Sequence, residues 1–419
     1  MKRLLYITTR LFWPADNGRK VTLDNFVRTL AEVYGYEVYL YSFLDGDQHY
    51  NESEVPAFVH QVEIASGISV SERIRNIVVR SLGPANWPLQ CSLYYSNQNK
   101  ERIQQFVERI HPDVIITDMI RTAMYLDAFA GSSARKIFDL DDILSTRYKR
   151  QLNSDSKMRS AVTGAYAQKL PAVLNRWLSR PFLQDQILKF EIKRLAKWEL
   201  YYAVAYDQVI LISGKEARIV NEQLGARKAY ALTIGVDIDY FTQKVSCEKD
   251  ANALSFLGNM NTAANADSLR FIVTQVLPRL NQRYILNVVG SCPETVGEEY
   301  KGNGRVRLLG RVHDTRVAVQ STQVFVAPIL YGSGIKNKIV EAMAMGMPVV
   351  TNAIGAEGMD VMDGRELLLA ETPEGIAQAV ERLMQDETLR LEMGQRAQAY
   401  VRANHDWREI QKVFGQMGL

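Results

Sequence analysis

Residues 328–358 constrain the fold of this chain more than any other stretch, and they read PILYGSGIKNKIVEAMAMGMPVVTNAIGAEG. An apolar run over 324–328 predicts a buried strand that ends in a glycine-rich turn. From Ile335 the apolar residues recur near helical spacing, and Gly346 ends the predicted helix before a second strand opens at Val349. Strand, turn, helix and strand make a right-handed βαβ unit, so the sequence predicts an α/β protein with parallel sheets.

The glycine turn at 332–334 lies at the carboxyl end of a parallel strand, where open α/β sheets bind ligands. Free N–H groups and the helix dipole at such a turn favour an anion such as phosphate. Lys336 falls in the first turn of the predicted helix, against the dipole preference, and a bound anion would relieve its placement. Glu341 falls further along the helix. Such a turn also occurs for packing alone, so both interpretations stay open at this point.

The length of 419 residues suits two domains better than one. Net charge is only +3, which gives no global argument for nucleic acid. The three cysteines are isolated, without metal-type spacing, and fit a reduced cytoplasm. The first residues lack a signal-peptide pattern, and no window approaches the roughly 18 uninterrupted apolar residues of a transmembrane helix. We therefore expect a cytoplasmic protein that begins with a strand.

The first half alternates strands and helices, beginning with a strand at 4–8 and a helix at 21–34. This opening unit lacks the three-glycine Rossmann fingerprint, so dinucleotide binding by that route is not expected. The Asn17-Gly18 pair between them reads as a turn or as a loop that faces phosphate or sugar.

Acidic residues follow two further predicted strands of this half. Asp118 ends the strand at 114–117, and Asp139, Asp141 and Asp142 surround the end of the strand at 136–140. Carboxylates at these strand ends point towards a ligand crevice. The alternative, also open, is that they cap the helices that follow.

A basic helical segment over 147–197 carries twelve lysines and arginines against three acids, with Trp177 and other apolar residues interleaved. Such a segment is typical of a helix on an anionic membrane surface. A charged, solvated helix face is the equal alternative. Nucleic acid is a poorer third, because the bases follow no recognisable nucleic-acid-binding module.

The second half opens after a polar stretch at 242–252, which we predict to be the domain linker. A second Rossmann-like alternation begins with a strand at 254–257 and the glycine turn Gly258-Asn259. It continues with a helix at 266–280, strands at 285–289 and 306–309, and helices at 373–384, 389–403 and 407–417.

Together these segments resemble the GT-B glycosyltransferases of the large retaining family 4. The matching stretches run from Asp207 to the end and include IGVDIDYF, FLGNMNTAANADSLRFI, VRLLGRVHD and the GSGIKNK turn. Bacterial transferases of surface-polysaccharide assembly have similar turns. The resemblance implies two Rossmann-like domains facing across a cleft, with the acceptor on the first and a nucleotide-sugar on the second. We predict domains at 1–240, with a basic insertion at about 147–200, and at 241–400, and a C-terminal helix at 401–419 that packs back on the first domain.

The resemblance also assigns residues of the donor site. The family has two glutamates separated by seven residues; Glu341 matches the second, while Ser333 stands at the first position. Glu341 is then expected to hold the nucleotide ribose, and Ser333, Gly334 and Ile335 to face the sugar and diphosphate. The basic pair that commonly follows the first glycine turn, here Gly258-Asn259, is absent. We therefore expect Lys336 to neutralise the charge of the diphosphate, with Arg311 as the second candidate. The loop with Arg311 and Val312 is expected to line the pocket for the nucleotide base.

On the acceptor side, the expected residues are Asn17, Gly18, Arg19 and Asp141, with Asp118 as a candidate for removing the acceptor proton. The Asp139-Leu140-Asp141 string has the spelling of a metal motif but lies in the acceptor half. No metal and no cofactor are expected, because a lysine and a helix start can stabilise the leaving diphosphate and the nucleotide-sugar is a substrate.

The sequence thus predicts a metal-independent, retaining hexosyltransferase that uses UDP- or GDP-sugars and a saccharide or lipid-linked saccharide acceptor in cell-surface polysaccharide synthesis. Docking on the inner membrane face is a further expectation, and no nucleic acid partner is expected. The alternatives are a GT-B-shaped nucleotide-sugar epimerase and a sugar-nucleotide-binding subunit without catalysis.

Overall fold

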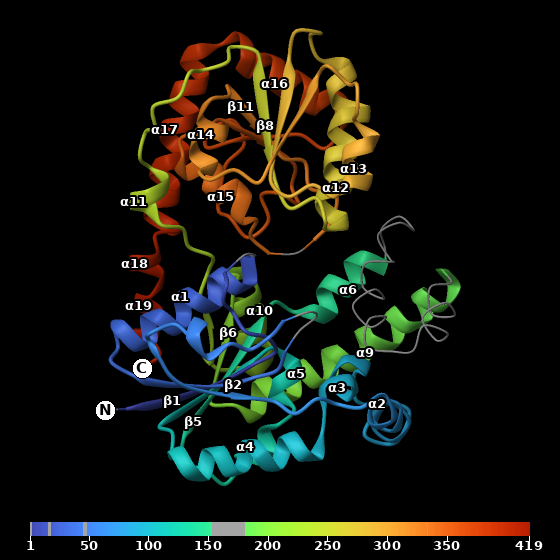
Figure 1. Cartoon of the computed structure of the whole chain (residues 1–419), viewed down its shortest axis with the longest axis vertical. Coiled ribbons are helices and arrows are strands. Elements are labelled where there is room, and N and C mark those ends of the chain that lie inside the picture. The colour runs from blue at the N-terminus through green and yellow to red at the C-terminus, as the bar shows by residue number, and fades with distance from the viewer. Residues whose placement is uncertain (1, 16–17, 45–47, 153–180, 333) are drawn as a thin grey trace. The chain divides into compact units, whose positions relative to one another are not determined.

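The computed structural model describes residues 2–15, 18–44, 48–152, 181–332 and 334–419 (Figure 1). The chain divides into two compact units. Unit 1 comprises Met1–Leu232 and Gln411–Leu419, and unit 2 comprises Thr233–Ile410. The chain therefore passes from one unit to the other twice.

Unit 1 is built on a seven-stranded parallel sheet with the order β3-β2-β1-β4-β5-β6-β7. The direction of winding changes between β1 and β4, and this topological switch point is where open α/β sheets form ligand crevices. The strands are β1 (Arg3–Thr8), β2 (Glu37–Ser42), β3 (Val59–Ile64), β4 (Val114–Asp118), β5 (Arg135–Asp141), β6 (Gln208–Leu211) and β7 (Ala229–Ala231).

Helices cover both faces of this sheet, with α1 and α4 on opposite sides (Figure 1). They are α1 (Gly18–Glu32), α2 (Val70–Asn76), which continues as the wider turn η2 (Ile77–Ser81), α3 (Leu89–Tyr94), α4 (Asn97–Ile110), α5 (Ile120–Ala123), α6 (Leu144–Leu152), α9 (Pro181–Ala205), α10 (Gly214–Leu224) and α19 (Lys412–Gln416), with short 3-10 turns η1 (Glu52–Glu54) and η3 (Leu126–Ala128). The core forms where apolar helix positions meet strand side chains. Phe106 of α4, for example, lies 6.2 Å from the Tyr39 ring and 6.4 Å from the Tyr41 ring of β2.

Unit 2 has a six-stranded parallel sheet with the order β10-β9-β8-β11-β12-β13. Its switch point lies between β8 and β11, so both units have the strand order typical of Rossmann folds. The strands are β8 (Ala253–Leu257), β9 (Ile285–Val289), β10 (Val306–Gly310), β11 (Val324–Val326), β12 (Val349–Thr351) and β13 (Leu368–Leu369).

The helices of unit 2 also lie on both sides of its sheet, with α12 and α13 on one side and α14 and α17 on the other (Figure 1). They are α11 (Ile238–Phe241), α12 (Ala263–Phe271), which continues through η5 (Ile272–Val276) and η6 (Leu277–Arg279), α13 (Glu294–Glu299), α14 (Thr315–Gln320), α15 (Asn337–Ala344), α16 (Pro373–Gln385), α17 (Glu387–Asn404) and α18 (Trp407–Ile410). Among the helices of the described residues, none is both long and apolar enough to cross a bilayer.

The units change at different residues from the predicted domains. We predicted boundaries after residues 240 and 400, whereas the division by contacts lies after Leu232 and after Ile410. The stretch 242–252, predicted to be a linker, belongs to unit 2: Val245 N–H donates to Oε1 of Gln320 (3.2 Å), and Asp250 N–H donates to the carbonyl of Ser321 (2.9 Å). Polar composition alone did not distinguish a linker from a loop fixed by backbone hydrogen bonds.

Some predicted elements also differ in the structure. The edge strand β3 was missed, because its sequence VHQVEI lacks the apolar run of the central strands. The predicted terminal helix is two short helices, α18 and α19. Most of the basic segment, 153–180 with Trp177, lies outside the described residues.

Candidate functional site

Two glycine turns follow β8 and β9, beside the switch point of unit 2, and helix α15 follows β11. Gly258 follows β8, and its N–H donates to the carbonyl of Val289 (2.9 Å). A methyl group on Gly290 would lie 2.0 Å from the carbonyl oxygen of Gly258, so the two turns touch through their backbones. This close approach, together with a φ of +123°, explains why glycine occupies position 290.

Lys338, near the start of α15, reaches across to this turn. Its Nζ donates to Oδ1 of Asn265 on α12 (2.5 Å) and lies 4.6 Å from the centre of the Phe256 ring. A methyl group on Gly258 would lie 2.9 Å from Nζ. Burial lowers the pKa of Lys338 to about 8, although attraction by Glu341 opposes the shift. The ammonium group is therefore held beside a glycine backbone with a neutral amide as its hydrogen-bonding partner.

Glu341 lies one helical turn after Lys338, on the same side of α15. Burial raises the pKa of its carboxyl group to about 7, and Lys338 opposes this rise. Among the described residues no hydrogen bond reaches this carboxylate. A half-buried acceptor without a donor suits hydroxyl groups of a ligand.

The turn before α15 differs from the prediction. The helix starts at Asn337, so Lys336 is the N-cap residue and does not lie in the first helical turn. Its Nζ donates to the carbonyl of Gly334. Ile335 is buried against Gly358, where a methyl group would lie 2.8 Å from Cγ1 of Ile335. Ser333 lies outside the described residues.

The remaining donor-side candidates lie at the same edge of the sheet but play different parts. Asn259 shapes the turn after β8: its carbonyl accepts from Nδ2 of Asn265 (2.9 Å) and its Oδ1 from Nδ2 of Asn261 (2.8 Å). Arg311 is exposed and Val312 half-buried after β10, which β9 and β8 separate from β11. No hydrogen bond or ion pair joins Arg311 to Lys338 or Glu341 in the described chain.

In unit 1, the predicted acceptor-side residues meet at the switch point in one ionic cluster. Arg19, the second residue of α1, contacts three carboxylates at the ends of β4 and β5. Its Nη2 lies 2.5 Å from Oδ1 of Asp118 and 2.8 Å from Oδ2 of Asp139, and its Nη1 lies 2.9 Å from Oδ1 of Asp141. Asp139 also accepts from the Tyr6 hydroxyl (2.6 Å). The fork of one guanidinium thus joins two strand ends to the helix start.

The carboxylates of this cluster have different protonation properties. Asp118 is fully buried, and the pKa of its carboxyl group stays lowered despite burial, because Arg19 and the Thr9 hydroxyl (2.7 Å) favour the charged form. Burial raises the pKa of Asp141 to about 7 in spite of Arg19. Asp141 is also the most exposed of the three, with 15% of its side chain accessible.

These contacts change the expected roles. Asp118 has both oxygens occupied, by Arg19 and by Thr9, which does not suit a group that must accept a proton. Arg19 is neutralised by carboxylates, so little of its charge is available for a phosphate. The space between the aspartates, where a cation would sit, is occupied by the guanidinium, and none of the three caps a helix. Gly18 starts α1, while Asn17 lies outside the described residues.

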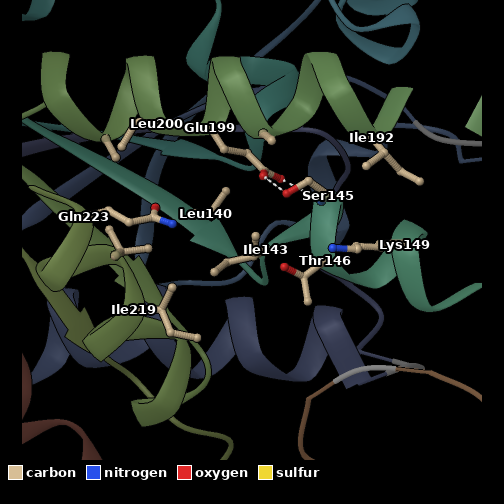
Figure 2. A pocket seen from close by; sticks show the side chains of 13 residues that line it. Leu140, Ile143, Ser145, Thr146, Lys149, Ile192, Glu199, Leu200, Ile219 and Gln223 are labelled. Atoms are coloured by element: carbon tan, nitrogen blue, oxygen red, sulfur yellow. Dashed lines mark hydrogen bonds between the residues drawn. The ribbon is translucent and has the colours of Figure 1, made fainter. Parts of the chain in front are cut away.

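A cavity of about 290 Å³ adjoins the end of β5, between α6, α9 and α10 (Figure 2). Its wall is mostly aliphatic and includes Leu140, Ile143 and Ile219. Figure 2 shows Glu199 pointing from α9 towards Ser145, whose hydroxyl donates to it (2.6 Å). Burial raises the pKa of Glu199 to about 7. The cavity therefore has a mostly apolar wall with one carboxyl group, and Lys149 also lines it.

Sequence reasoning missed Lys338 and this cavity. Lys338 could have been found, because it precedes Glu341 by three residues and so shares its helix face. The cavity could not, since its wall is formed by the packing of α6, α9 and α10, which has no local signal in the sequence.

Comparison with known families explains the geometry of unit 2. Residues 251–386, which include Gly258, Lys338 and Glu341, match the family described as Glycosyl transferases group 1. This part of the chain is similar to a group 1 glycosyl transferase domain. The protein is a glycosyltransferase.

Two relatives of this glycosyltransferase span different shares of it. An uncharacterized glycosyltransferase of Methanocaldococcus jannaschii is 21% identical over 99% of this chain and 98% of its own length. The phosphatidyl-myo-inositol mannosyltransferase of Mycolicibacterium smegmatis is 28% identical over 47% of this chain and 53% of its own.

The crystal structure of Anabaena HepE in complex with UDP and glucose is similar over 100% of this chain and 99% of that one, with a TM-score of 0.64 and 14% sequence identity. At this identity the likeness concerns the fold, and the glycosyltransferase has the GT-B fold with two Rossmann-like domains.

Proposed function

We propose that this glycosyltransferase is a retaining, metal-independent member of family 4 that transfers a hexose from a UDP- or GDP-sugar to a saccharide or lipid-linked saccharide. We further propose that it acts in cell-surface polysaccharide synthesis, in the cytoplasm at the inner membrane face.

The observation that carries this proposal is the Lys338–Glu341 arrangement beside Gly258. Lys338 is half-buried and its hydrogen-bonding partner is a neutral amide, so its charge is available to an anion. The Glu341 carboxylate, one helical turn away, accepts no hydrogen bond within the described residues and can accept bonds from the two hydroxyl groups of a ribose. A nucleoside diphosphate has both groups at comparable spacing. HepE in complex with UDP and glucose supports a donor of this class.

The same arrangement supports the chemistry. When the bond between the sugar and the diphosphate breaks, negative charge grows on the leaving group. A preorganised cation in a desolvated site stabilises that charge, by about 3 kcal/mol for one good donor. Lys338 is the first candidate for this role, and Lys336, at the N-cap of α15, is the second.

The acceptor is expected at the switch point of unit 1. Asp141 is more accessible than Asp118 and its pKa of about 7 lets it exchange a proton near neutrality, so it replaces Asp118 as the candidate for assisting the acceptor hydroxyl. The aliphatic cavity that begins at Leu140 supports an acceptor with an apolar part. The mannosyltransferase of M. smegmatis is named for a lipid acceptor, which agrees with this proposal.

The first experiment is a thermal-shift panel of UDP, GDP, ADP and dTDP and their hexose derivatives, with and without EDTA. Selective stabilisation by one nucleotide, unchanged by EDTA, is expected, because a ligand that binds the folded state raises the melting temperature. The variant Lys338→Met should lose the shift, while Lys301→Met, an exposed lysine of the same unit, should keep it. A shift of equal size in both variants would contradict the proposed diphosphate contact.

Turnover separates the proposal from its two alternatives. With the stabilising nucleotide-sugar and a saccharide acceptor, a new glycoside with the donor's anomeric configuration is expected by NMR. An epimerase would instead change the donor without an acceptor. A subunit that binds but does not catalyse would give the thermal shift and no product.

A further inference from the structure

Unit 1 exposes a cluster of large apolar side chains on one short segment. The residues lie on α2 and η2 and just after them, and Val79 and Leu82 are 60% and 64% exposed. Together the exposed side chains are Val70, Ile74, Val78, Val79 and Leu82. Single exposed apolar residues are ordinary on a protein surface, whereas a contiguous group marks an interaction site. We call this group the α2 face.

The α2 face is held outward by polar anchors on the opposite side of the same segment. Asn76 is buried and donates to the carbonyl of Tyr95 (2.7 Å), and Ser81 is buried with its hydroxyl 2.8 Å from that of Ser92. A helix on the surface of a soluble protein usually buries its apolar side and exposes its polar side. This segment buries the polar Asn76 and Ser81 and leaves most of its apolar side chains exposed, while Ile77 packs against the core.

Aromatic and basic side chains border the α2 face. The Arg80 guanidinium lies 4.7 Å from the Trp87 ring centre, and Trp87 lies 6.0 Å from Trp198 of α9. Tyr201, which is exposed, follows at 4.9 Å from Trp198. Tryptophan and tyrosine are the residues enriched at the interface between lipid and water.

The charge around this border is strongly positive. Helix α9 contributes Arg194, which donates to the carbonyl of Ser81 (3.1 Å), and it carries Lys193 and Lys197 on exposed positions. The segment at 70–82 contains three arginines and one acid, Glu72. Apolar side chains surrounded by aromatic rings and bases complement a bilayer with anionic headgroups.

We propose that the α2 face docks unit 1 on an anionic membrane surface. The reason for such docking rests on the proposed function, because a lipid-linked acceptor must be reached at the membrane. The sequence predicted docking through the basic segment at 147–197. The exposed apolar residues of this proposal lie instead on α2 and η2, and α9, which belongs to the basic segment, forms the basic border.

The test is co-sedimentation of the full chain with vesicles of phosphatidylcholine alone and with about one-third phosphatidylglycerol. Binding is expected on the anionic vesicles only, and to weaken as salt rises. The double variant Val79→Asp with Leu82→Asp should bind at least tenfold more weakly. The matched control, Val317→Asp with Leu391→Asp, changes two exposed apolar residues of unit 2 and should bind like the wild type.

A variant that removes one positive charge distinguishes binding to anionic lipid from non-specific hydrophobic adsorption. Removing one base, as in Arg75→Gln, should weaken binding to anionic vesicles about fivefold at low salt. Arg396→Gln, on α17 of unit 2, is the control and should have no effect.

Three results would overturn the proposal. They are no vesicle binding at low salt, equal binding by wild type and the α2-face variant, and a dimer in light scattering that this variant dissociates, which would assign the face to a second copy of the chain. The nucleotide thermal shift is measured in parallel. If no nucleotide raises the melting temperature of the wild type, the proposed function is refuted. If a nucleotide raises it but the protein does not bind vesicles, only the docking is refuted.

Discussion

At the residue scale, the two lysines of the GSGIKNK turn have different surroundings. Lys336 folds back onto the carbonyl of Gly334, whereas Lys338 reaches the glycine turn after β8. Lys338→Met should weaken nucleotide binding roughly ten- to hundredfold, the effect of losing about 1.5–3 kcal/mol from a charged hydrogen bond. Lys336→Met should have the smaller effect. Isothermal titration of both variants decides the order, and a larger loss for Lys336→Met would reverse our assignment.

The half-buried Lys338 and Glu341 also predict a pH dependence. Glu341, with a pKa raised to about 7, must be ionised to accept ribose hydroxyls, so affinity falls as the pH drops through 7. Lys338, with a pKa lowered to about 8, must be protonated, so affinity falls as the pH rises through 8. A bell-shaped profile with its maximum between these values is expected. A nucleotide-sugar is the right probe, because its phosphates do not titrate in this range.

Glu341→Gln provides the control for that profile. It should remove the fall on the acid side and move the fall on the alkaline side to lower pH, because the charge of Glu341 no longer raises the pKa of Lys338. A flat profile in the wild type would contradict the proposed contacts of both residues.

The Arg19 cluster makes a prediction about stability. Arg19→Met leaves Asp118, Asp139 and Asp141 without their shared cation, and breaking a buried ion pair costs about 3–5 kcal/mol. The loss should be largest at pH 8, where the carboxylates are ionised. It should shrink towards pH 5, because without Arg19 their pKa values rise and the protonated groups need no partner. Urea unfolding at the two pH values measures this difference, and an equal loss at both would contradict it.

At the scale of elements, helix α17 lies against the end of α15 through two glycines. A methyl group on Gly394 would lie 2.1 Å from the carbonyl oxygen of Gly346. Gly394→Ala should therefore destabilise unit 2 by about 1–3 kcal/mol, as overpacking does. Gly297→Ala on α13 is the matched control, since its methyl group would have 3.9 Å to the nearest atom and should be neutral or slightly stabilising. Thermal unfolding of the two variants compares them.

The elements also separate what the sequence could predict from what it could not. The central strands and the βαβ unit of 324–351 were predicted, because buried parallel strands have continuous apolar runs. The edge strand β3 has polar residues on its outer side and no such run. The start of α15 was predicted too early, since the apolar Ile335 fits the helical spacing but its backbone lies before the helix.

The same contrast holds for the site. Glu341 and Gly258 could be found from local motifs, and the structure places both at the switch point of unit 2. The ion pairs of Arg19 with three aspartates could not be predicted from local motifs, because these partners lie about a hundred residues away in the sequence. The order of strands in the sheet decides which residues lie together at its edge, and no local sequence pattern reveals that order.

At the scale of the whole molecule, the chain's last residues complete unit 1. Phe414 is buried. The centre of its ring lies 5.7 Å from that of Phe26 in α1 and 6.0 Å from that of Tyr34, just after α1. Phe414→Ala should destabilise unit 1 by about 3–5 kcal/mol, the usual loss for a buried phenylalanine. Nucleotide affinity should stay unchanged, because Lys338 and Glu341 belong to unit 2. Denaturant unfolding with and without nucleotide tests both statements.

The division of unit 1 into two segments has a consequence for translation. Synthesis runs from the N-terminus, so unit 2 leaves the ribosome complete while unit 1 still lacks Gln411–Leu419. Until Gln411–Leu419 have left the ribosome, the pocket for Phe414 beside Phe26 stays open to water. A product that stops early in unit 2 would keep that apolar surface exposed and become a substrate for chaperones and proteases. Unit 1 can therefore be completed only after unit 2 has been synthesised.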